Sequence, residues 1–105
     1  MSDYKVEISG DAKSDVIAIR TYIRDVLLNH DASKKFLEDT KAAVASLNTF
    51  PYRNEVRPGS KLFEGLEKRQ YFYRKNFCLF YVIKEEVKTV RIIKVAYSPS
   101  NLDEE

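Results

Sequence analysis

The pattern of apolar and polar residues begins with a strict alternation over residues 4–9. Every second position from Tyr4 to Ile8 is apolar, which is typical of a strand with one buried face. Ser9 and Asp11 follow, and either side chain can cap a helix by accepting a hydrogen bond from a free backbone N–H. The sequence therefore predicts a strand that leads directly into a helix.

Two helical repeats come next. In the first, an apolar residue recurs every three or four positions as far as about Leu28, which predicts one buried stripe. That stripe contains Ala12, Val16, Ile19, Ile23 and Val26. The second helix is expected to be capped by Asp31 and to end where Pro51 disfavours a helical Phe50. Its stripe contains Ala32, Phe36, Thr40, Ala43, Leu47 and Phe50. The corner at residues 29–31 is short, so the two helices should pack antiparallel.

Residues 52–68 form a connection that is too long for a simple turn. Pro58 and Gly59 mark a turn inside it. Three apolar residues are expected to hold its second half on the core, namely Leu62, Phe63 and Leu66. Three strands with connections of hairpin length are predicted next, over residues 69–74, 77–84 and 88–97. The last strand is apolar on both parities, which predicts a central strand with both faces at least partly covered.

These elements have the order β-α-α-β-β-β and predict an α+β fold, a helical hairpin packed on a mainly antiparallel four-stranded sheet. A chain of 105 residues is expected to form a single domain over residues 1–105. Residues 98–105 are expected to be a short frayed tail.

Composition adds limits on the class of protein. The chain is 44% hydrophobic and 32% charged, as is usual for a soluble globular protein. No apolar run approaches the roughly 18–20 residues that span a bilayer, and the N-terminus lacks the apolar core of a secretion signal. A cytoplasmic protein without membrane contact is therefore expected. The single Cys78 and the single His30 cannot complete a Cys/His zinc site, so neither a metal nor a cofactor is expected.

The net charge of +2 is unevenly distributed. Residues 53–75 hold seven lysines and arginines against three glutamates, a local balance of +4. Such a segment attracts a polyanion, either nucleic acid or an acidic protein segment, or else it is an ordinary solvated loop. The predicted partner-binding cations are Arg53, Arg57, Lys61, Arg69, Arg74 and Lys75.

Several segments of the chain occur in a suggestive order and spacing. They are YKVEIS, AKSDVIAIRTYI, LNTFP, Arg69, NFCLFYVI and VRIIKVAYS. Through them the chain resembles the RelE/ParE family of toxins from bacterial toxin–antitoxin pairs. The resemblance implies a small toxin that inhibits growth, contributes to plasmid stabilisation and is held inactive by a cognate antitoxin. We expect the antitoxin's C-terminal segment to dock beside residues 53–75, as a helix in a groove or an added strand, with acidic residues meeting the cations.

The resemblance also implies two mechanisms: RelE-like members cut mRNA on the ribosome, and ParE-like members inhibit DNA gyrase. RelE-like nucleases usually carry two basic residues on the first strand of this hairpin and an arginine on the next. Near the chain end they carry an arginine followed by a tyrosine or histidine. Aligned with these positions, Arg69 is kept, whereas Tyr71, Cys78 and Ser98 replace the others. A first-helix pattern that looks ParE-like is formed by Asp15, Ile19, Tyr22 and Ile23. Binding to gyrase without catalysis is therefore the leading hypothesis.

Alternatives stay open at this point. The chain could instead be an unusual ribosome-dependent endonuclease whose catalytic residues differ from those of RelE-like nucleases. The candidates for such catalytic residues are Arg69, Arg74, Arg91 and Tyr97. A relic that binds a partner without toxicity is a third possibility. Arg69 could instead pair with a helix carboxylate such as Asp15. Cys78, in an apolar strand, is expected to be a neutral core thiol and not a nucleophile.

Overall fold

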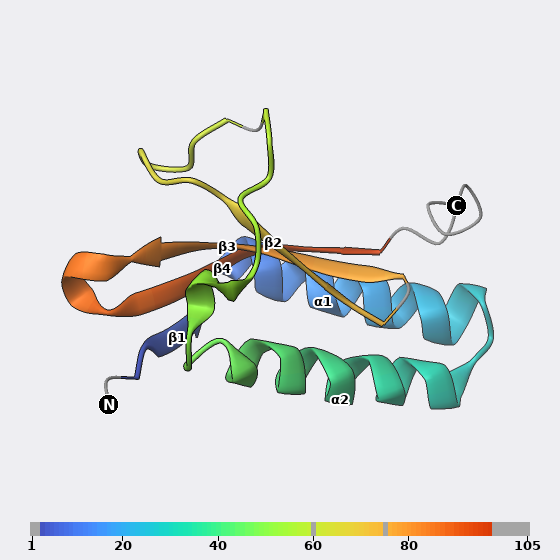
Figure 1. Cartoon of the computed structure of the whole chain (residues 1–105). Helices are drawn as coiled ribbons and strands as arrows, with labels where there is room; N and C mark the ends of the chain where they lie inside the picture. The colour runs from blue at the N-terminus through green and yellow to red at the C-terminus, as the bar shows by residue number, and fades with distance from the viewer. Residues whose placement is uncertain (1–2, 60, 75, 98–105) are drawn as a thin grey trace.

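The computed structural model describes residues 3–59, 61–74 and 76–97. The predicted tail at residues 98–105 lies outside these residues. The main elements follow the predicted order: β1 (Lys5–Ile8), α1 (Gly10–Thr21), α2 (His30–Ser46), β2 (Arg69–Tyr73), β3 (Phe77–Lys84) and β4 (Thr89–Tyr97). Short helical turns add to them: a π-helical turn (Tyr22–Val26) and 3-10 turns (Pro51–Arg53 and Glu85–Val87). The α+β fold is thus confirmed (Figure 1).

The four strands form one sheet in the order β1-β4-β3-β2. β2, β3 and β4 pair antiparallel, whereas β1 pairs with β4 in parallel, with Lys5 opposite Thr89. β4 therefore lies between β1 and β3, which confirms the prediction of a central strand.

A β-bulge lies in β4 at Ile93. Tyr81 of β3 pairs with Ile92, but the preceding residue of β3 pairs with Lys94. The extra residue shifts the alternation by one position, so Ile92 and Val95 both join the core. The bulge therefore explains why apolar residues occur at both odd and even positions of β4. The sequence pattern did not reveal this bulge.

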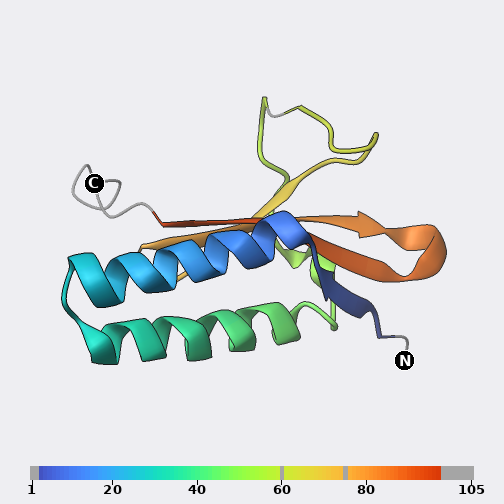
Figure 2. The same cartoon turned by 180° about the vertical axis from the view of Figure 1, so that it is seen from behind.

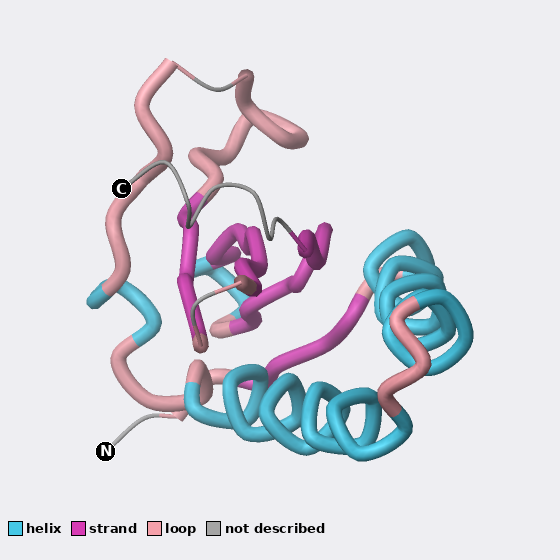
Figure 3. The backbone as a smooth tube through the Cα atoms, turned by 90° about the vertical axis from the view of Figure 1, so that its right-hand side faces the viewer, coloured by secondary structure: helices cyan, strands magenta, loops and turns pink. Residues whose placement is uncertain are grey.

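The helices run antiparallel on one face of the sheet, and the segment of residues 55–68 stands off the other face (Figures 1 and 2). The end-on view shows the same separation (Figure 3). The core lies between helices and sheet, and its buried members include Ala12, Ile23, Phe36, Ala43, Leu47, Leu79, Tyr81, Ile83, Val90, Ile92 and Val95. The stripes predicted for both helices therefore supply most of the helical side of the core.

The helix caps follow the expected chemistry, with one correction. Ser9 Oγ accepts a hydrogen bond from the backbone N–H of Ala12 at 3.1 Å, as the sequence predicted. The prediction that Asp31 caps the second helix is wrong, because Asn29 Oδ1 accepts from the N–H of Ala32 at 3.0 Å. α2 begins at His30, one residue before the predicted cap.

Two apolar residues assigned to the buried stripes are exposed. Val26 is 62% exposed because the first helix ends in a π-helical turn, in which Leu27 N–H bonds to the carbonyl of Tyr22 and the wider turn rotates the side chains. Phe50 is 65% exposed because α2 ends at Ser46, four residues earlier than predicted, and Phe50 adopts a left-handed backbone with φ 51°.

The segment of residues 55–68 is not anchored as predicted. Leu62 is 60% exposed, and Phe63 and Leu66 bond to each other's backbone in a tight turn. Among the described residues, the core cluster contains none of these three. The expectation that they hold the segment on the core is therefore wrong. The turn is instead held by the two backbone hydrogen bonds between Phe63 and Leu66.

Candidate functional site

The four candidate catalytic residues are spread over the sheet. Arg69 is the first residue of β2, whereas Arg74 follows its last residue, Tyr73, and has a left-handed backbone with φ 55°. Arg91 of β4 points away from the helices and pairs with Glu7 of β1 at 2.8 Å. Tyr97 ends β4 on the helix side of the sheet. Only Arg74 and Tyr97 of this set therefore share a site.

Arg69 has a structural role at the start of β2. One guanidinium nitrogen donates to the carbonyls of Asn54 at 2.7 Å and Tyr52 at 3.3 Å. Its charge lies 5.0 Å from the centre of the Tyr52 ring. Asp15 instead accepts a hydrogen bond from Val95, so the predicted pairing of Arg69 with Asp15 is wrong.

Arg74 forms a bidentate ion pair with Asp39 of α2. Arg74 Nε and Nη2 donate to the two carboxylate oxygens at 2.7 and 3.1 Å, and Lys35 lies 3.9 Å from the same carboxylate. The hydrogen bonds from Arg74 hold the pKa of Asp39 below its usual value. Because Asp39 neutralises the guanidinium, Arg74 is poorly placed to steady a phosphate.

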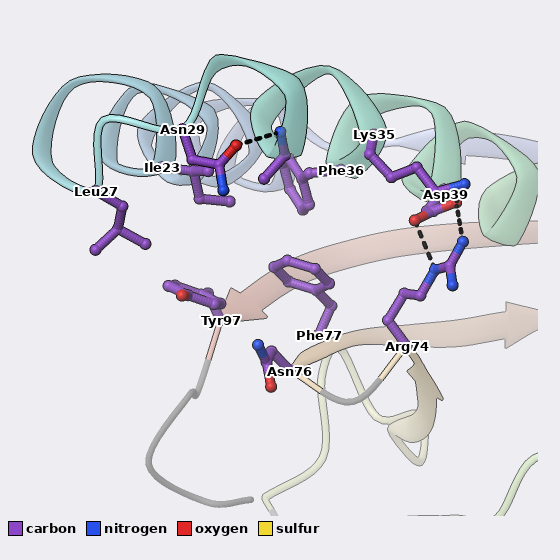
Figure 4. A pocket seen from close by; sticks show the side chains of 11 residues that line it. Ile23, Leu27, Asn29, Lys35, Phe36, Asp39, Arg74, Asn76, Phe77 and Tyr97 are labelled. Atoms are coloured by element: carbon purple, nitrogen blue, oxygen red, sulfur yellow. Dashed lines mark hydrogen bonds and ion pairs between the residues drawn. The ribbon is translucent and has the colours of Figure 1, made fainter.

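A pocket of about 370 Å³ lies between this ion pair and the corner of the two helices. Figure 4 shows Phe77 and Tyr97 on its sheet side, with Phe36 and Leu27 opposite them. The Tyr97 ring stacks on Phe77 at 5.2 Å and lies 5.9 Å from Tyr22. Burial, followed by the neighbouring Tyr22, raises the pKa of Tyr97, so this phenol holds its proton more firmly than a free tyrosine.

The predicted partner-binding cations do not share one surface. Arg53 donates to the carbonyls of Ser46 at 3.1 Å and Thr49 at 2.9 Å, where it closes the C-terminal end of α2. Arg57 lies over the ring of Phe80, 5.3 Å from its centre, on the sheet face opposite the helices. Lys61 is exposed on the segment of residues 55–68, and Lys75 lies outside the described residues.

The positions aligned with nuclease residues also lie apart. Tyr71 faces the helix side, where its ring lies 5.5 Å from the charge of Arg53. Cys78 lies on the opposite face and is buried, and burial raises the pKa of its thiol. The expected neutral thiol is thus consistent with its surroundings, and Ser98 lies outside the described residues.

An apolar groove of about 510 Å³ runs between β1, α1 and α2. Lys13 and Lys41 are the charged residues that line it, and none of its lining residues belongs to residues 53–75. Its apolar walls are formed by Val6, Ile8, Val16, Ile17, Leu37, Val44 and Ala45. Sequence reasoning missed this groove, although Leu37 and Val44 signal it as a second apolar line beside the buried stripe of α2.

Comparison with known proteins identifies the family of this chain. Residues 6–98 match the model of the ParE toxin of type II toxin–antitoxin systems, parDE. The chain belongs to this ParE toxin family. No curated protein sequence matches the chain. The predicted resemblance to RelE/ParE toxins is therefore confirmed at the level of the family.

Solved structures share the ParE fold at low sequence identity. The chromosomal ParDE toxin–antitoxin system from P. aeruginosa superposes with a TM-score of 0.70 at 20% identity, over 90% of this chain and 96% of that chain. The toxin–antitoxin complex RelBE2 from Mycobacterium tuberculosis superposes with a TM-score of 0.59 at 22% identity, over 92% and 93%. Both relatives support the helical hairpin on a mixed sheet.

Within residues 3–59, 61–74 and 76–97, no three His, Cys, Asp or Glu side chains come together as ligands for a metal ion. In the same part of the chain, no helix combines the length and apolar character needed to cross a bilayer.

Proposed function

We propose that this ParE-family chain is a growth-inhibiting toxin that binds and blocks DNA gyrase without bond chemistry of its own. The observation that carries the proposal is the dispersal of Arg69, Arg74 and Arg91 over two ends and two faces of the sheet. General acid–base catalysis needs its groups within hydrogen-bond reach of one reacting centre. A protein that blocks its target by contact has no such requirement.

Parallel assays of the purified chain test this proposal. We expect inhibition of supercoiling by gyrase and no codon-specific cleavage of mRNA on purified ribosomes. In the cleavage assay, Arg91→Ala is the control for Tyr97→Phe, since Arg91 faces away from the pocket and pairs with Glu7. Ribosome-dependent cuts that disappear in Tyr97→Phe would place the chain among the endonucleases.

The endonuclease alternative is supported by one observation, the shared pocket of Arg74 and Tyr97. In that hypothesis, Tyr97 would donate a proton and Arg74 would steady the phosphate. The Asp39 carboxylate forms an ion pair with the Arg74 guanidinium at 2.7 Å. Asp39→Asn should weaken this pair, leave Arg74 available for the phosphate and increase any cleavage. Cleavage that is absent in both wild type and Asp39→Asn would exclude this alternative.

We further propose that a cognate antitoxin neutralises the toxin by filling the apolar groove between β1, α1 and α2. The groove fits the apolar stripe of an amphipathic helix or an extended segment. Lys13 and Lys41 line it without a carboxylate among the lining residues, so acidic residues flanking that stripe would find complementary charge.

The cations of residues 53–75 make a second, polar contact in this proposal. Arg57 is the strongest candidate there, because its guanidinium contacts a ring while Arg53, Arg69 and Arg74 already bond to polar groups of the fold. Charge reversal at Arg57 should weaken the complex most at low salt. Cytoplasmic action and plasmid stabilisation belong to the same proposal, and a relic without toxicity would bind the antitoxin but leave growth unchanged.

A further inference from the structure

Arg20 lies beside the apolar groove, at the end of the groove nearest the corner of the two helices. Lys13, Val16 and Ile17 line the groove from α1. Residues three, four and seven positions apart share one line on a helix, so Arg20 continues this line by one turn towards the corner. The neighbouring α2 runs antiparallel beside this part of α1 (Figure 2). Arg20 therefore borders the surface on which the antitoxin is proposed to dock.

This arginine has no partner within the part of the chain that the structure describes. Among those residues its Nε is shut off from solvent without a hydrogen bond, and its side chain forms no ion pair. The two terminal nitrogens are not shut off in this way, so the guanidinium can still be reached from outside. A buried N–H without an acceptor lowers stability, and an arginine is seldom buried unless it is paired. The toxin thus carries an unsatisfied donor at the end of its groove.

The other arginines of the described residues are all engaged within the chain. Each of them meets a carboxylate, a backbone carbonyl or an aromatic ring, namely Arg24, Arg53, Arg57, Arg69, Arg74 and Arg91. The hydrogen bond from Arg24 lowers the pKa of Asp25, and the charge of Arg20 makes a smaller contribution. Arg24 already bonds to both carboxylate oxygens of Asp25, at 2.8 and 3.1 Å. Arg20 is therefore available for a carboxylate from outside the chain.

The surroundings of Arg20 favour a carboxylate on a protein over a phosphate on a nucleic acid. The groove beside it has mainly apolar walls, which fit apolar side chains of a protein and offer little to a sugar–phosphate backbone. The cations that line the groove, Lys13 and Lys41, face no carboxylate among its lining residues. A guanidinium presents a planar pair of donors that matches a carboxylate. An apolar segment with an acidic residue at one end complements both features.

We propose that Arg20 anchors a carboxylate of the cognate antitoxin at the end of the groove nearest the helix corner. This inference rests on the proposed function, in which the antitoxin fills the groove. It adds the residue that fixes the orientation of the antitoxin, because the acidic residue must lie at the Arg20 end. An antitoxin without that carboxylate would cover the guanidinium and leave it unpaired, which weakens binding. Arg20 therefore selects the cognate antitoxin from others that have the same apolar stripe.

Arg20→Met in the full chain tests the inference, because it keeps an apolar stem and removes the charge. With the purified cognate antitoxin as the probe, calorimetry should show a loss of affinity of roughly tenfold to a hundredfold. The melting temperature of the free toxin should stay the same or rise, since the unsatisfied donor is gone. An arginine with a merely structural role would show the reverse, a lower melting temperature with unchanged affinity. Unchanged affinity in Arg20→Met would overturn the inference.

Arg20→Lys decides the case in which Arg20→Met melts below the wild type. Lysine keeps the charge but lacks the planar fork, so this variant should fold like the wild type and bind the antitoxin more weakly. Wild-type affinity in Arg20→Lys would overturn the inference. Arg24→Met is the matched control and should bind like the wild type, since Arg24 lies on the next turn and is paired with Asp25. An equal loss in Arg24→Met would indicate a general effect of charge and would also overturn the inference.

A double-mutant cycle identifies the partner carboxylate. Each acidic residue of the antitoxin is replaced in turn by the corresponding amide, and one of these replacements should cause little further loss of affinity in Arg20→Met. Strict additivity for every acidic residue would contradict a direct contact. A DNA duplex or an RNA strand whose binding is lost in Arg20→Met would assign the guanidinium to a phosphate and would overturn the inference as well.

The inference and the proposed antitoxin site fail in different ways. If Ile17→Glu keeps the affinity for the antitoxin, the groove is not the binding site and both proposals fail. If Ile17→Glu loses affinity but Arg20→Met does not, the groove is retained as the binding site and only the role of Arg20 is wrong.

Discussion

Asp15 of α1 accepts a hydrogen bond from the backbone N–H of Val95 in β4, at 3.0 Å and 80 residues further along the chain. The parallel partner β1 ends opposite Ile92, so beyond that point the outer edge of β4 has no strand beside it among the residues that the structure describes. The Asp15 carboxylate takes the place of the missing strand at Val95 and connects the first helix to the centre of the sheet.

Asp15→Ala should therefore destabilise the protein. The substitution leaves the N–H of Val95 without its acceptor in a partly buried position, at a cost of about 1–3 kcal/mol in the free energy of unfolding. Urea denaturation measures the loss. Glu38→Ala, an exposed carboxylate on α2, is the control and should have little effect. Equal free energies of unfolding for the two variants would mean that the hydrogen bond from Val95 to Asp15 does not stabilise the fold.

The buried hydrogen bond between Thr40 and Tyr73 predicts a non-additive pair. The two hydroxyl oxygens lie 2.8 Å apart in the core. Thr40→Val and Tyr73→Phe should each cost about 1–3 kcal/mol in the free energy of unfolding, because each leaves one buried hydroxyl unpaired. The double variant should cost less than the sum of the two, since both polar groups are then gone. Strict additivity in denaturation experiments would refute the coupling.

Tyr73 also predicts a loss of stability at high pH. Burial raises the pKa of Tyr73 to about 12, compared with an ordinary value of 10.0. Its contribution is therefore complete below pH 10 and is lost as the pH rises from 10 towards 12, because the unfolded chain ionises first. Denaturation midpoints of wild type and Tyr73→Phe should converge over this interval. A constant difference between them would contradict the raised pKa.

Glu85 predicts the opposite behaviour in acid. Its carboxylate accepts hydrogen bonds from Lys88 at 2.7 Å, Tyr52 at 2.7 Å and Tyr4 at 2.8 Å. These donors, Lys88 foremost, lower the pKa of Glu85 from 4.5 to about 2. The stabilisation is therefore present above pH 4.5 and is lost as the pH falls towards 2.

The measurement compares Glu85→Gln with the wild type over this acid interval. The difference in denaturation midpoint should be largest above pH 4.5 and should shrink as the pH approaches 2. Glu86→Gln, at the adjacent exposed position, should follow the wild type at every pH. If the difference in denaturation midpoint between Glu85→Gln and wild type does not change with pH, the charge of the Glu85 carboxylate is not the source of the stabilisation.

Groove variants should separate the apolar and ionic parts of antitoxin binding. Ile17 is 59% exposed on the groove wall, so Ile17→Glu should fold but lose roughly a hundredfold or more in affinity at any salt concentration. Lys41→Glu should weaken the complex mainly at low salt, because its contribution is ionic. Titration calorimetry at two salt concentrations distinguishes the apolar from the ionic contribution. Unchanged affinity of Ile17→Glu for the antitoxin would show that the antitoxin binds another surface.

Sequence reasoning identified the elements whose patterns are local. The bounds predicted for β3 agree with the structure, and the Ser9 cap follows directly from the residue type. Val26 and Phe50 were misplaced because a π-helical turn and a left-handed residue end the two helices, and the spacing of apolar residues carries no trace of either. Asn29 displaced Asp31 as the cap, since both residue types satisfy the same rule and only the helix start decides between them.

The candidate site was less predictable than the fold. The cations of residues 53–75 are close in sequence, but Arg57 lies over Phe80 on the sheet face opposite the helices, whereas Arg69 of β2 lies beside Tyr52 and pairs with the core residue Tyr81. The extent of β2 separates Arg69 from Arg74. The groove between β1, α1 and α2 depends on how three elements meet, which is a property of the tertiary arrangement and not of any single pattern.

The parallel pairing of β1 with β4 has a consequence for the order of events during synthesis. β1 leaves the ribosome first, but its only strand neighbour in the sheet is β4, with Lys5 opposite Thr89. A nascent chain that lacks β4 therefore cannot assemble the sheet, because the missing strand belongs between β1 and β3. A fragment that ends before residue 89 would lack the strand that joins β1 to β3, so the sheet can form only after β4 has been synthesised.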